Sequence, residues 1–339
     1  MKLRLGARTS PLSRAQADWV TARLAEHGVA VEFVGITTKG DVDRRDLAQI
    51  GGTGVFAAAV REALLAGTID LAVHSLKDLP TLPEPGLRVA AVPEREDTRD
   101  VLVGLRLADL AADRPTRIGT GAPRRAAQLT EYGRVNDRPI ETVPVRGNVG
   151  TRVDLVRSGR VDAVVLAAAG LRRLGLLSGV GAEPLEVAGL PAELLPEEVM
   201  LPAPGQGALG LEIAESLAPE LAAAVTALND PVAALETRTE RAFLARLEAG
   251  CTAPVGARAK VKSVHGKRHD LTLTAVVGGS LGSNPPESIG DGSVLRVETS
   301  GPVDDSFDVP LRFATEAADR ALIELRRTAQ DSARAARRG

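Results

Sequence analysis

The sequence predicts an α/β protein with mainly parallel sheets. Strand-like and helix-like segments alternate from the N-terminus, beginning with a strand over 2–7, a helix from Pro11 to about His27 and a strand over 29–37. A second alternating set begins at Arg99. Repeated strand–helix units are typical of layered α/β folds. A chain of 339 residues is long enough for two or three domains.

Local chemistry explains where the first elements begin and end. Ser10 followed by Pro11 is a favourable helix start, because serine caps free N–H groups and proline fits the first helical turn. The glycine-rich segment 51–54 leads into a helix that ends near Ala66, and 68–75 has the pattern of a buried strand. A proline-rich stretch excludes regular structure directly after that strand.

The later elements form a second set and a smaller unit. The second set has strands that end near Gly119 and span 140–145 and 161–166, each followed by a predicted helix. We expect a small α+β unit near the C-terminus. Its predicted strands lie around 255–264, 271–277 and 294–299, and its predicted helix spans about 311–327.

Composition excludes several classes of function. With 42 basic and 44 acidic residues and only 2% aromatics, the chain lacks the charge and the stacking surfaces of a typical nucleic-acid-binding protein. Four histidines and one cysteine cannot assemble a zinc cluster. No apolar run approaches the roughly 20 residues of a membrane span, and the first residues lack the apolar core of a signal peptide. A single cysteine fits a reducing compartment, so we expect a cytoplasmic protein.

Cys251 is the single cysteine of the chain. It follows a predicted helix over 231–248 and precedes a predicted strand. Gly250 can end the helix and Pro254 prevents its restart, so we expect the thiol on a tight loop. A lone cysteine can be a buried apolar residue, a nucleophile or the attachment point of a cofactor. The loop by itself leaves these three interpretations open.

Arginines recur at turns between strands and helices. Each turn combines a strand end, a small residue, an arginine and a helix start, as at Arg124–Arg125 and Arg146–Arg152. Ligands of open α/β sheets bind at the carboxyl ends of strands. Helix N-termini attract anions, and arginine forks bind carboxylates or phosphates. The repeated pattern indicates a polyanionic ligand, although any one of these arginines could instead lie on a solvated helix face.

Ser75, Lys77 and Asp78 stand at or directly after the end of the predicted strand over 68–75. A carboxylate in this position could accept a hydrogen bond from a ligand N–H or stabilise a cation formed during a reaction. It could also be an ordinary turn residue beside an ion-paired lysine. No Ser-x-x-Lys pattern supports a Ser/Lys hydrolase. The Gly-x-x-x-x-Gly-Lys-Ser/Thr loop of nucleoside triphosphate binding is missing as well.

A series of longer runs is more specific than any of these turns. The runs are 7–12 with Gln16, 73–80, 119–120 with 124–125, 146–152, 169–175, 204–208, and 248–251 with 254–256. In sequence and order they resemble the hydroxymethylbilane synthase (porphobilinogen deaminase) family, over about residues 3–260. Beyond about residue 278 the resemblance fades, and the segment 279–308 has no role that we can assign.

The resemblance implies a three-domain fold. The first two domains of the family resemble the lobes of type II periplasmic binding proteins, and the third is a small α+β domain that carries the cofactor loop. We expect a discontinuous first domain over 1–93 and 208–228, a second over 94–207 and a third over 229–330.

The resemblance also implies an activity in tetrapyrrole (haem) biosynthesis. Members of the family join four porphobilinogen molecules head to tail, release ammonia at each step and hydrolyse the product to the linear hydroxymethylbilane. The chain grows on a covalent dipyrromethane cofactor, and Cys251 matches the position to which it is attached by a thioether.

The matching residues acquire expected roles. Asp78 matches the catalytic residue, which would accept pyrrole N–H hydrogen bonds and stabilise the cation left by ammonia. With Asp78 and Cys251, the expected cofactor-binding residues are Ser75, Lys77, Thr120, Arg124, Arg125, Arg146 and Arg152. The expected substrate-binding residues are Arg8, Ser10, Gln16, Arg146, Arg152 and Arg173. No metal is implied.

Two positions depart from the family pattern. Thr53 stands where many members have a lysine, and Gly121-Ala122 replaces a common serine pair, so some carboxylate contacts should differ here. We expect a monomer. Two rival functions fit the same architecture: a non-catalytic anion-binding protein of the periplasmic type, and a degenerate paralogue that assembles its cofactor but does not turn over.

Overall fold

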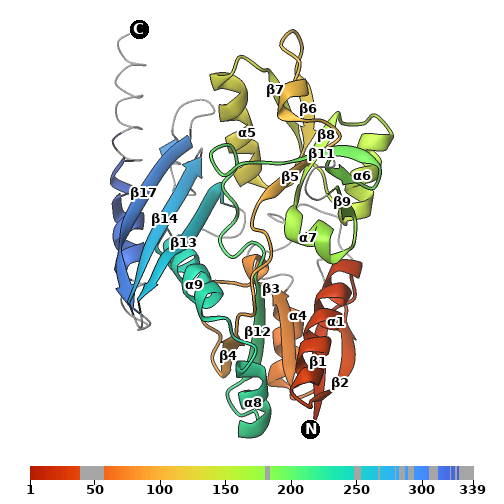
Figure 1. Ribbon diagram of the computed structural model, residues 1–339, viewed down its shortest axis with the longest axis vertical. Helices are drawn as coiled ribbons and strands as arrows, with labels where there is room; N and C mark the ends of the chain where they lie inside the picture. Colours follow the sequence, from red (N-terminus) through yellow and green to blue (C-terminus); the bar gives the residue numbers. More distant parts are fainter. Residues whose placement is uncertain are drawn as a thin grey trace. The chain divides into compact units, whose positions relative to one another are not determined.

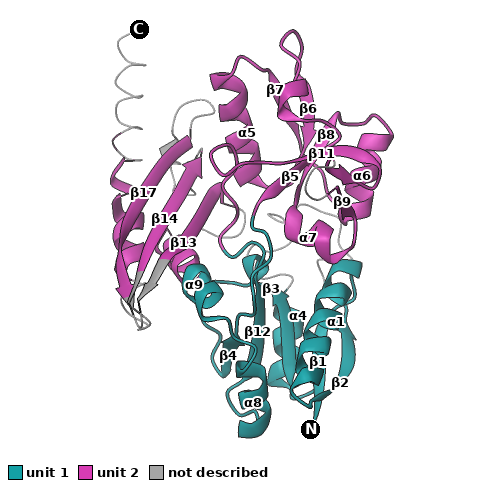
Figure 2. Cartoon of the chain, viewed as in Figure 1, with its two compact units in different colours: residues 1–98, 205–237 teal, residues 99–204, 238–339 magenta. Residues whose placement is uncertain are grey.

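The chain forms two compact units in the computed structural model. The structure describes residues 1–38, 57–179, 184–247, 253–265, 268–278, 280–281, 287–288, 294–304, 312–320, 322–324 and 327. The first unit comprises Met1–Thr98 and Gly205–Thr237, and the second comprises Arg99–Pro204 and Arg238–Gly339 (Figure 2). The chain therefore leaves the first unit after Thr98 and re-enters it at Gly205. The expected division into three domains stays a prediction.

The first unit is a five-stranded sheet of order β2-β1-β3-β12-β4 with helices on both faces (Figure 1). Its strands are β1 (Lys2–Arg8), β2 (Ala30–Ile36), β3 (Leu71–Ser75), β4 (Leu87–Ala91) and β12 (Leu209–Ala214). β1 is parallel to β2 and β3, whereas β12 is antiparallel to β3 and β4. The helices α1 (Pro11–Glu26) and α8 (Pro219–Thr226) pack on one face, and α4 (Ala58–Leu65) packs on the other. The short 3-10 helix η1 (Leu76–Asp78) follows β3.

The second unit contains a seven-stranded sheet of order β7-β6-β8-β5-β11-β10-β9. These strands are β5 (Asp100–Val103), β6 (Thr116–Gly119), β7 (Ile140–Val143), β8 (Ala163–Ala167), β9 (Leu177–Ser178), β10 (Glu186–Val187) and β11 (Leu190–Leu194). Helices α6 (Val149–Arg157) and α7 (Ala168–Arg173) pack on one face, and α5 (Pro123–Val135) packs on the other. The short 3-10 helix η2 (Leu107–Asp109) follows β5.

The two sheets share one strand order. The order β7-β6-β8-β5-β11 of the second unit repeats the order β2-β1-β3-β12-β4 of the first. In each sheet the first three strands are parallel and the fourth is antiparallel. The fourth strand is β5 in one unit and β12 in the other, and each is the strand that follows the chain's crossing into that unit. The α/β class is confirmed, but these crossing strands make the sheets mixed rather than mainly parallel.

The C-terminal part of the second unit is a small antiparallel sheet of order β13-β14-β17, as expected for an α+β unit. It consists of β13 (Val255–His265), β14 (Arg268–Gly278) and β17 (Val294–Asp304), accompanied by the short strands β15 (Ser280–Leu281) and β16 (Glu287–Ser288). The helix α9 (Pro231–Arg246) precedes β13, and residues 312–320 are helical. None of the helices in the described parts of the chain is long and apolar enough to cross a membrane.

A buried carboxylate fixes α5 to the second sheet. Asp100, the first residue of β5, is fully buried. Its two oxygens accept hydrogen bonds from Arg124 Nη2 at 2.8 Å and Arg125 Nη2 at 2.7 Å. The guanidinium groups also donate to the carbonyl oxygens of Leu201 and Val165. Burial lowers the pKa of Arg124 below its ordinary value, and Asp100 opposes that shift.

A second buried carboxylate joins α4 to the first sheet. Glu212 in β12 lies 2.8 Å from Arg61 Nη2 and 3.2 Å from His74 Nε2. Burial by itself raises the pKa of the Glu212 carboxyl, but the nearby His74 and the hydrogen-bonded Arg61 outweigh it and place the pKa below its ordinary value. The carboxylate therefore stays charged in the folded protein at neutral pH.

Replacing Asp100 with Asn should lower the free energy of unfolding by about 3–5 kcal/mol, because two buried guanidinium groups lose their counter-charge. Urea unfolding followed by circular dichroism measures the change. Asp162→Asn is the matched control, since Asp162 pairs with Arg117 in the same unit at a partly exposed site. The control should cost about 1 kcal/mol or less. Equal costs for the two variants would contradict the structural role of Asp100.

Acid should remove the stabilisation that Glu212 provides. A carboxyl whose folded pKa is lowered stabilises the protein fully above its unfolded pKa, near 4.5, and loses that contribution as pH falls through the folded value. The unfolding free energy of Glu212→Gln should therefore be lower at pH 7 and fall less steeply toward pH 3 than that of the unmodified protein. Parallel pH profiles from urea titrations would show that Glu212 has no such role.

Candidate active site

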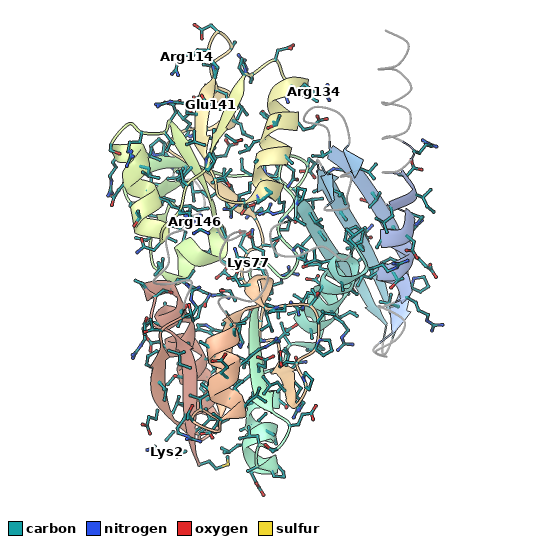
Figure 3. All side chains as sticks on the ribbon, turned by 180° about the vertical axis from the view of Figure 1, so that it is seen from behind. Lys2, Lys77, Arg114, Arg134, Glu141 and Arg146 are labelled. Carbon is teal, nitrogen blue, oxygen red and sulfur yellow. The ribbon has the colours of Figure 1, made fainter. Side chains whose placement is uncertain are left out.

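The first unit presents a group of predicted site residues at one edge of its sheet. β1 and β3 are parallel and therefore end at the same edge. Arg8 is the last residue of β1, Ser75 is the last residue of β3, and Lys77 and Asp78 follow in η1. Figure 3 shows Lys77 on this turn. The sequence thus predicted correctly that these residues stand at strand ends.

Hydrogen bonds hold α1 against the end of β3. Ser10 caps α1, as predicted, by accepting the N–H of Ser13 at 3.3 Å. Gln16 is buried, and its Nε2 donates to Ser75 Oγ at 2.9 Å. The Ser75 hydroxyl in turn donates to Gln16 Oε1 at 3.3 Å. Ser75 and Gln16, which are 59 residues apart in the chain, therefore form one rigid pair.

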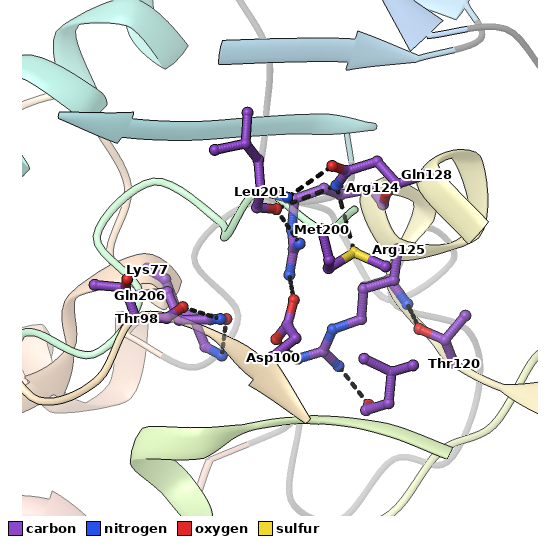
Figure 4. A network of polar contacts seen from close by, with 12 residues as sticks. Lys77, Thr98, Asp100, Thr120, Arg124, Arg125, Gln128, Met200, Leu201 and Gln206 are labelled. Carbon is purple, nitrogen blue, oxygen red and sulfur yellow. Dashed lines mark hydrogen bonds and ion pairs between the residues drawn. The ribbon is translucent and has the colours of Figure 1, made fainter. Parts of the chain in front are cut away.

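Asp78 differs from Asp100 and Glu212, whose carboxylates are paired with arginine. Its side chain is half-buried, and within the part of the chain that the structure describes its carboxylate makes no hydrogen bond or ion pair. The adjacent Lys77 is held by Gln206, whose Oε1 lies 3.2 Å from Lys77 Nζ (Figure 4). The acid is thus able to accept hydrogen bonds from a ligand without giving up an internal bond to a described residue.

The second unit places Thr120 directly after β6, where α5 is about to begin. Thr120 is buried, and its Oγ1 accepts the N–H of Ala122 at 3.2 Å. A side chain at Gly121 would bring its Cβ to 2.7 Å from the carbonyl oxygen of Val145. The turn can pass this close to Val145 because residue 121 is glycine. A serine in its place would require the backbone to shift.

Arg124 and Arg125 were expected to bind the cofactor. Both lie in the first turn of α5, and both pair with the buried Asp100 (Figure 4). Their side chains are 5% and 7% exposed. One carboxylate between two guanidinium groups leaves one positive charge uncompensated by this acid. The Arg125 Nε has no hydrogen-bond partner among the described residues. Binding by these two arginines stays a prediction.

The other predicted arginines of this unit stand after β7 and β8. Arg146 follows β7, as Figure 3 shows, and α6 begins at Val149. Asn148 caps α6 by accepting the N–H of Thr151 at 2.9 Å. Arg152 folds back on its own turn, where its Nε donates to the carbonyl oxygen of Gly147 at 3.0 Å. Arg173 is the last residue of α7, which begins directly after β8.

Each unit by itself offers donors that suit the carboxylates of an anionic ligand. In the first unit, Arg8 ends β1 and Lys77 follows β3. In the second unit, Arg146 follows β7, Arg152 lies in α6 and Arg173 ends α7. A dipyrromethane group bears acetate and propionate side chains, so its chemistry fits this donor set. Among the described residues, no cluster of His, Cys, Asp and Glu could hold a metal ion.

Three predictions fall outside the described residues. They concern Cys251, the glycine-rich segment 51–54 that includes Thr53, and most of the 279–308 segment. The flanks of Cys251 are described: α9 ends at Arg246 and β13 begins at Val255, which agrees with the predicted helix and strand.

Sequence reasoning missed two residues that organise the site. Asp100 gave one signal, since it is an acid that opens an apolar strand. Gln206 belongs to the run 204–208, but nothing within that run indicates its partner. Its contact with Lys77 joins residues 129 positions apart, and such a pairing leaves no local signal.

Comparison with known proteins gives two family matches. Residues 3–219 match the family described as "Porphobilinogen deaminase, dipyromethane cofactor binding domain". Residues 234–319 match "Porphobilinogen deaminase, C-terminal domain". Together these matches span the arginine-bearing turns of both units and the sheet β13-β14-β17.

Individual relatives have similar length. Porphobilinogen deaminase 1 of Streptomyces coelicolor is 48% identical over 326 residues, which cover 95% of each chain. Porphobilinogen deaminase of Syntrophus aciditrophicus is 41% identical over 329 residues, 94% of this chain and 95% of the relative.

Similar solved structures include proteins of another kind. One is a probable amino-acid transporter's extracellular binding protein from Bacillus subtilis, with 10% identity, a TM-score of 0.36 and coverage of 67% of this chain and 90% of that one. Another is a substrate-binding domain from Lactococcus lactis, with 9% identity, a TM-score of 0.39 and coverage of 67% and 87%.

The sequence matches are far stronger than these structural ones. They extend over nearly the whole chain, and one of the two matching domains is defined by binding of the dipyrromethane cofactor. They decide against a non-catalytic binding protein. By these matches the chain belongs to the porphobilinogen deaminase (hydroxymethylbilane synthase) family, transferases of tetrapyrrole biosynthesis.

Proposed function

We propose that the chain joins four porphobilinogen molecules on a dipyrromethane primer bound to Cys251 and releases hydroxymethylbilane. One observation carries the assignment of residues to this reaction. The half-buried carboxylate of Asp78 makes no hydrogen bond to any described residue. It lies at the edge of the first sheet where β1 and β3 end, and this edge also carries Arg8 and Lys77. This edge combines an available acid for the reacting ring with cations for the ring's carboxylates.

Asp78 is the catalytic residue in this proposal. When ammonia leaves porphobilinogen, positive charge develops on the ring and spreads to the pyrrole nitrogen. A carboxylate that accepts the pyrrole N–H stabilises this charge, and it does so most strongly in a site that excludes water. The same carboxylate can accept the proton released when the new carbon–carbon bond forms.

The cations bind the carboxylates of substrate and cofactor. Each porphobilinogen unit adds an acetate and a propionate, so the negative charge of the ligand rises as the chain grows. Arg146 after β7, Arg152 in α6 and Arg173 at the end of α7 supply bidentate donors. Arg8, Ser10 and Gln16 are assigned to the substrate, and Ser75, Lys77 and Thr120 to the cofactor.

Arg124 and Arg125 contribute in a different way. Because both pair with Asp100, their remaining donors and the excess charge at the start of α5 act on the ligand from fixed positions. Such preorganised charge costs little reorganisation when a ligand carboxylate arrives. Asp100 is thus a positioning residue for these two arginines.

Cys251 acts once. Its sulfur forms a bond to the aminomethyl carbon of a porphobilinogen, the carbon–nitrogen bond breaks, and ammonia leaves with the thiol proton. A dipyrromethane primer held on Cys251 would supply a nucleophilic pyrrole carbon for chain growth. Because the thiol must stay reduced until this step, we place the protein in the cytoplasm. We also propose that it is a monomer.

Intact-mass spectrometry tests the role of Cys251. Protein incubated with porphobilinogen should gain the mass of two porphobilinogen units less two ammonia molecules, and Cys251→Ala should not gain it. Thr252→Ala is the matched control, since it changes the next residue in the chain and leaves the thiol in place. The assignment fails if Cys251→Ala carries the same adduct.

Replacing Asp78 with Asn should lower kcat by about a hundredfold or more while the protein remains folded, because the ring loses a charge that stabilises its cation. Porphobilinogen consumption measures kcat, and thermal unfolding checks the fold. The control is Asp70→Asn, which removes an acid paired with Arg4 beside the opposite end of β3. It should lower stability slightly and leave kcat unchanged. Near-normal turnover in Asp78→Asn would remove Asp78 from the mechanism.

A degenerate paralogue would carry the primer and yet consume no porphobilinogen in its unmodified form.

A further inference from the structure

The side-chain amide of Gln206 joins Lys77 to the segment by which the chain leaves the first unit. Gln206 is 1% exposed. Its Oε1 accepts from Lys77 Nζ at 3.2 Å, and its Nε2 donates to the carbonyl oxygen of Thr98 at 2.8 Å (Figure 4). The chemistry fixes the orientation of the amide, because an ammonium group can only donate and a carbonyl oxygen can only accept.

The backbone of Gln206 is held as firmly as its side chain. Its carbonyl oxygen accepts from Arg95 Nε at 3.0 Å, and Arg95 Nη1 lies 3.3 Å from Glu236 Oε2 in α9. The side chains of Arg95 and Glu236 are 6% and 9% exposed. The segment that leaves the unit, the segment that returns to it and α9 are therefore joined at one residue.

The neighbouring glycine lets the two segments come this close. Gly207 has a φ of +86°, and a Cβ in its place would lie 2.4 Å from the carbonyl oxygen of Glu96. The N–H of Glu96 donates to the Gly207 carbonyl oxygen at 3.3 Å. The position of Gln206 is thus set by backbone contacts that tolerate little change.

The hydrogen bond to Gln206 restricts the motion of the Lys77 side chain. A lysine has a flexible four-carbon stem, and a ligand that binds its ammonium group must overcome the entropy of that stem. Gln206 restricts the ammonium group before the ligand arrives, and such preorganisation increases affinity. Glutamine suits this position because it offers an acceptor to Lys77 and a donor to Thr98 at the same time.

We propose that Gln206 is a positioning residue that fixes the Lys77 ammonium group for a carboxylate of the substrate or cofactor. The inference rests on the proposed function, in which Lys77 binds such a carboxylate. It adds that the position of this cation depends on the two segments that cross between the units. A change in those segments would alter binding at Lys77.

A double-mutant cycle with porphobilinogen as the probe tests the proposal. Gln206→Met keeps the length of the side chain and removes both polar ends, and we expect kcat/KM to fall about tenfold. Lys77→Met should lower it by at least as much. The double variant should match Lys77→Met alone, because Gln206 acts through Lys77 and has nothing left to position. Gln206→Glu, which keeps an acceptor for Lys77 but no donor for Thr98, should fall between the unmodified protein and Gln206→Met.

The control is Asn229→Ala, which removes the hydrogen bond from Val92 N–H to Asn229 Oδ1 in the same unit and has no contact with Lys77. It should lower the thermal midpoint and leave kcat/KM unchanged. Additive losses in the cycle, or a Gln206→Met or Lys77→Met value within twofold of the unmodified protein, would overturn the proposal. Should Gln206→Met fail to fold, a normal kcat/KM in Gln206→Glu would overturn it as well. Failure of the unmodified protein to consume porphobilinogen would instead refute the proposed function.

Discussion

Everything in the proposed mechanism depends on parallel strands that end at one edge of each sheet. In both units three neighbouring strands run in the same direction, so the turns after them lie side by side. A turn between a strand end and a helix start exposes backbone N–H groups and can carry a cation. The first sheet places Arg8, Lys77 and Asp78 at the ends of its parallel strands, and the second places Thr120 and Arg146 there. One topological feature, used twice, thus brings together residues from distant parts of the chain.

Buried charges hold this arrangement in place. Asp100 fixes the first turn of α5, and Glu212 joins α4 to β3 and β12 through Arg61 and His74. Buried ion pairs contribute little net stability compared with apolar packing, but they are costly to break. Their value in this fold is geometric, because each fixes the direction of a helix or strand whose end carries site residues. The contact of Gln206 with Lys77 extends the same principle to a single side chain.

Local signals in the sequence predicted most of the fold. The helix expected over 11–27 is observed as Pro11–Glu26 because its cap, Ser10 followed by Pro11, is a local feature. Strand direction is not local: Leu209–Ala214 has the same apolar pattern in either direction, so its antiparallel pairing with β3 could not be predicted. The three strands expected near the C-terminus are observed as β13, β14 and β17, but their antiparallel pairing was not predicted.

The candidate site shows the same division between local and distant information. Residues at strand ends could be located from the sequence, because glycine, proline and arginine mark the turns. Partners could not be predicted when they lie far away in the chain. Arg124 and Arg125 pair with Asp100, 24 and 25 residues earlier, and Lys77 meets Gln206 only after the chain has crossed into the second unit and returned.

A crystal structure of the protein purified with its cofactor tests the central claim most directly. The account predicts continuous density from the sulfur of Cys251 to two linked pyrrole rings, with a pyrrole nitrogen within hydrogen-bonding distance of Asp78. The acetate and propionate groups should contact arginine and lysine side chains at the ends of the parallel strands. Density for the rings elsewhere, with Asp78 contacting solvent alone, would contradict the account.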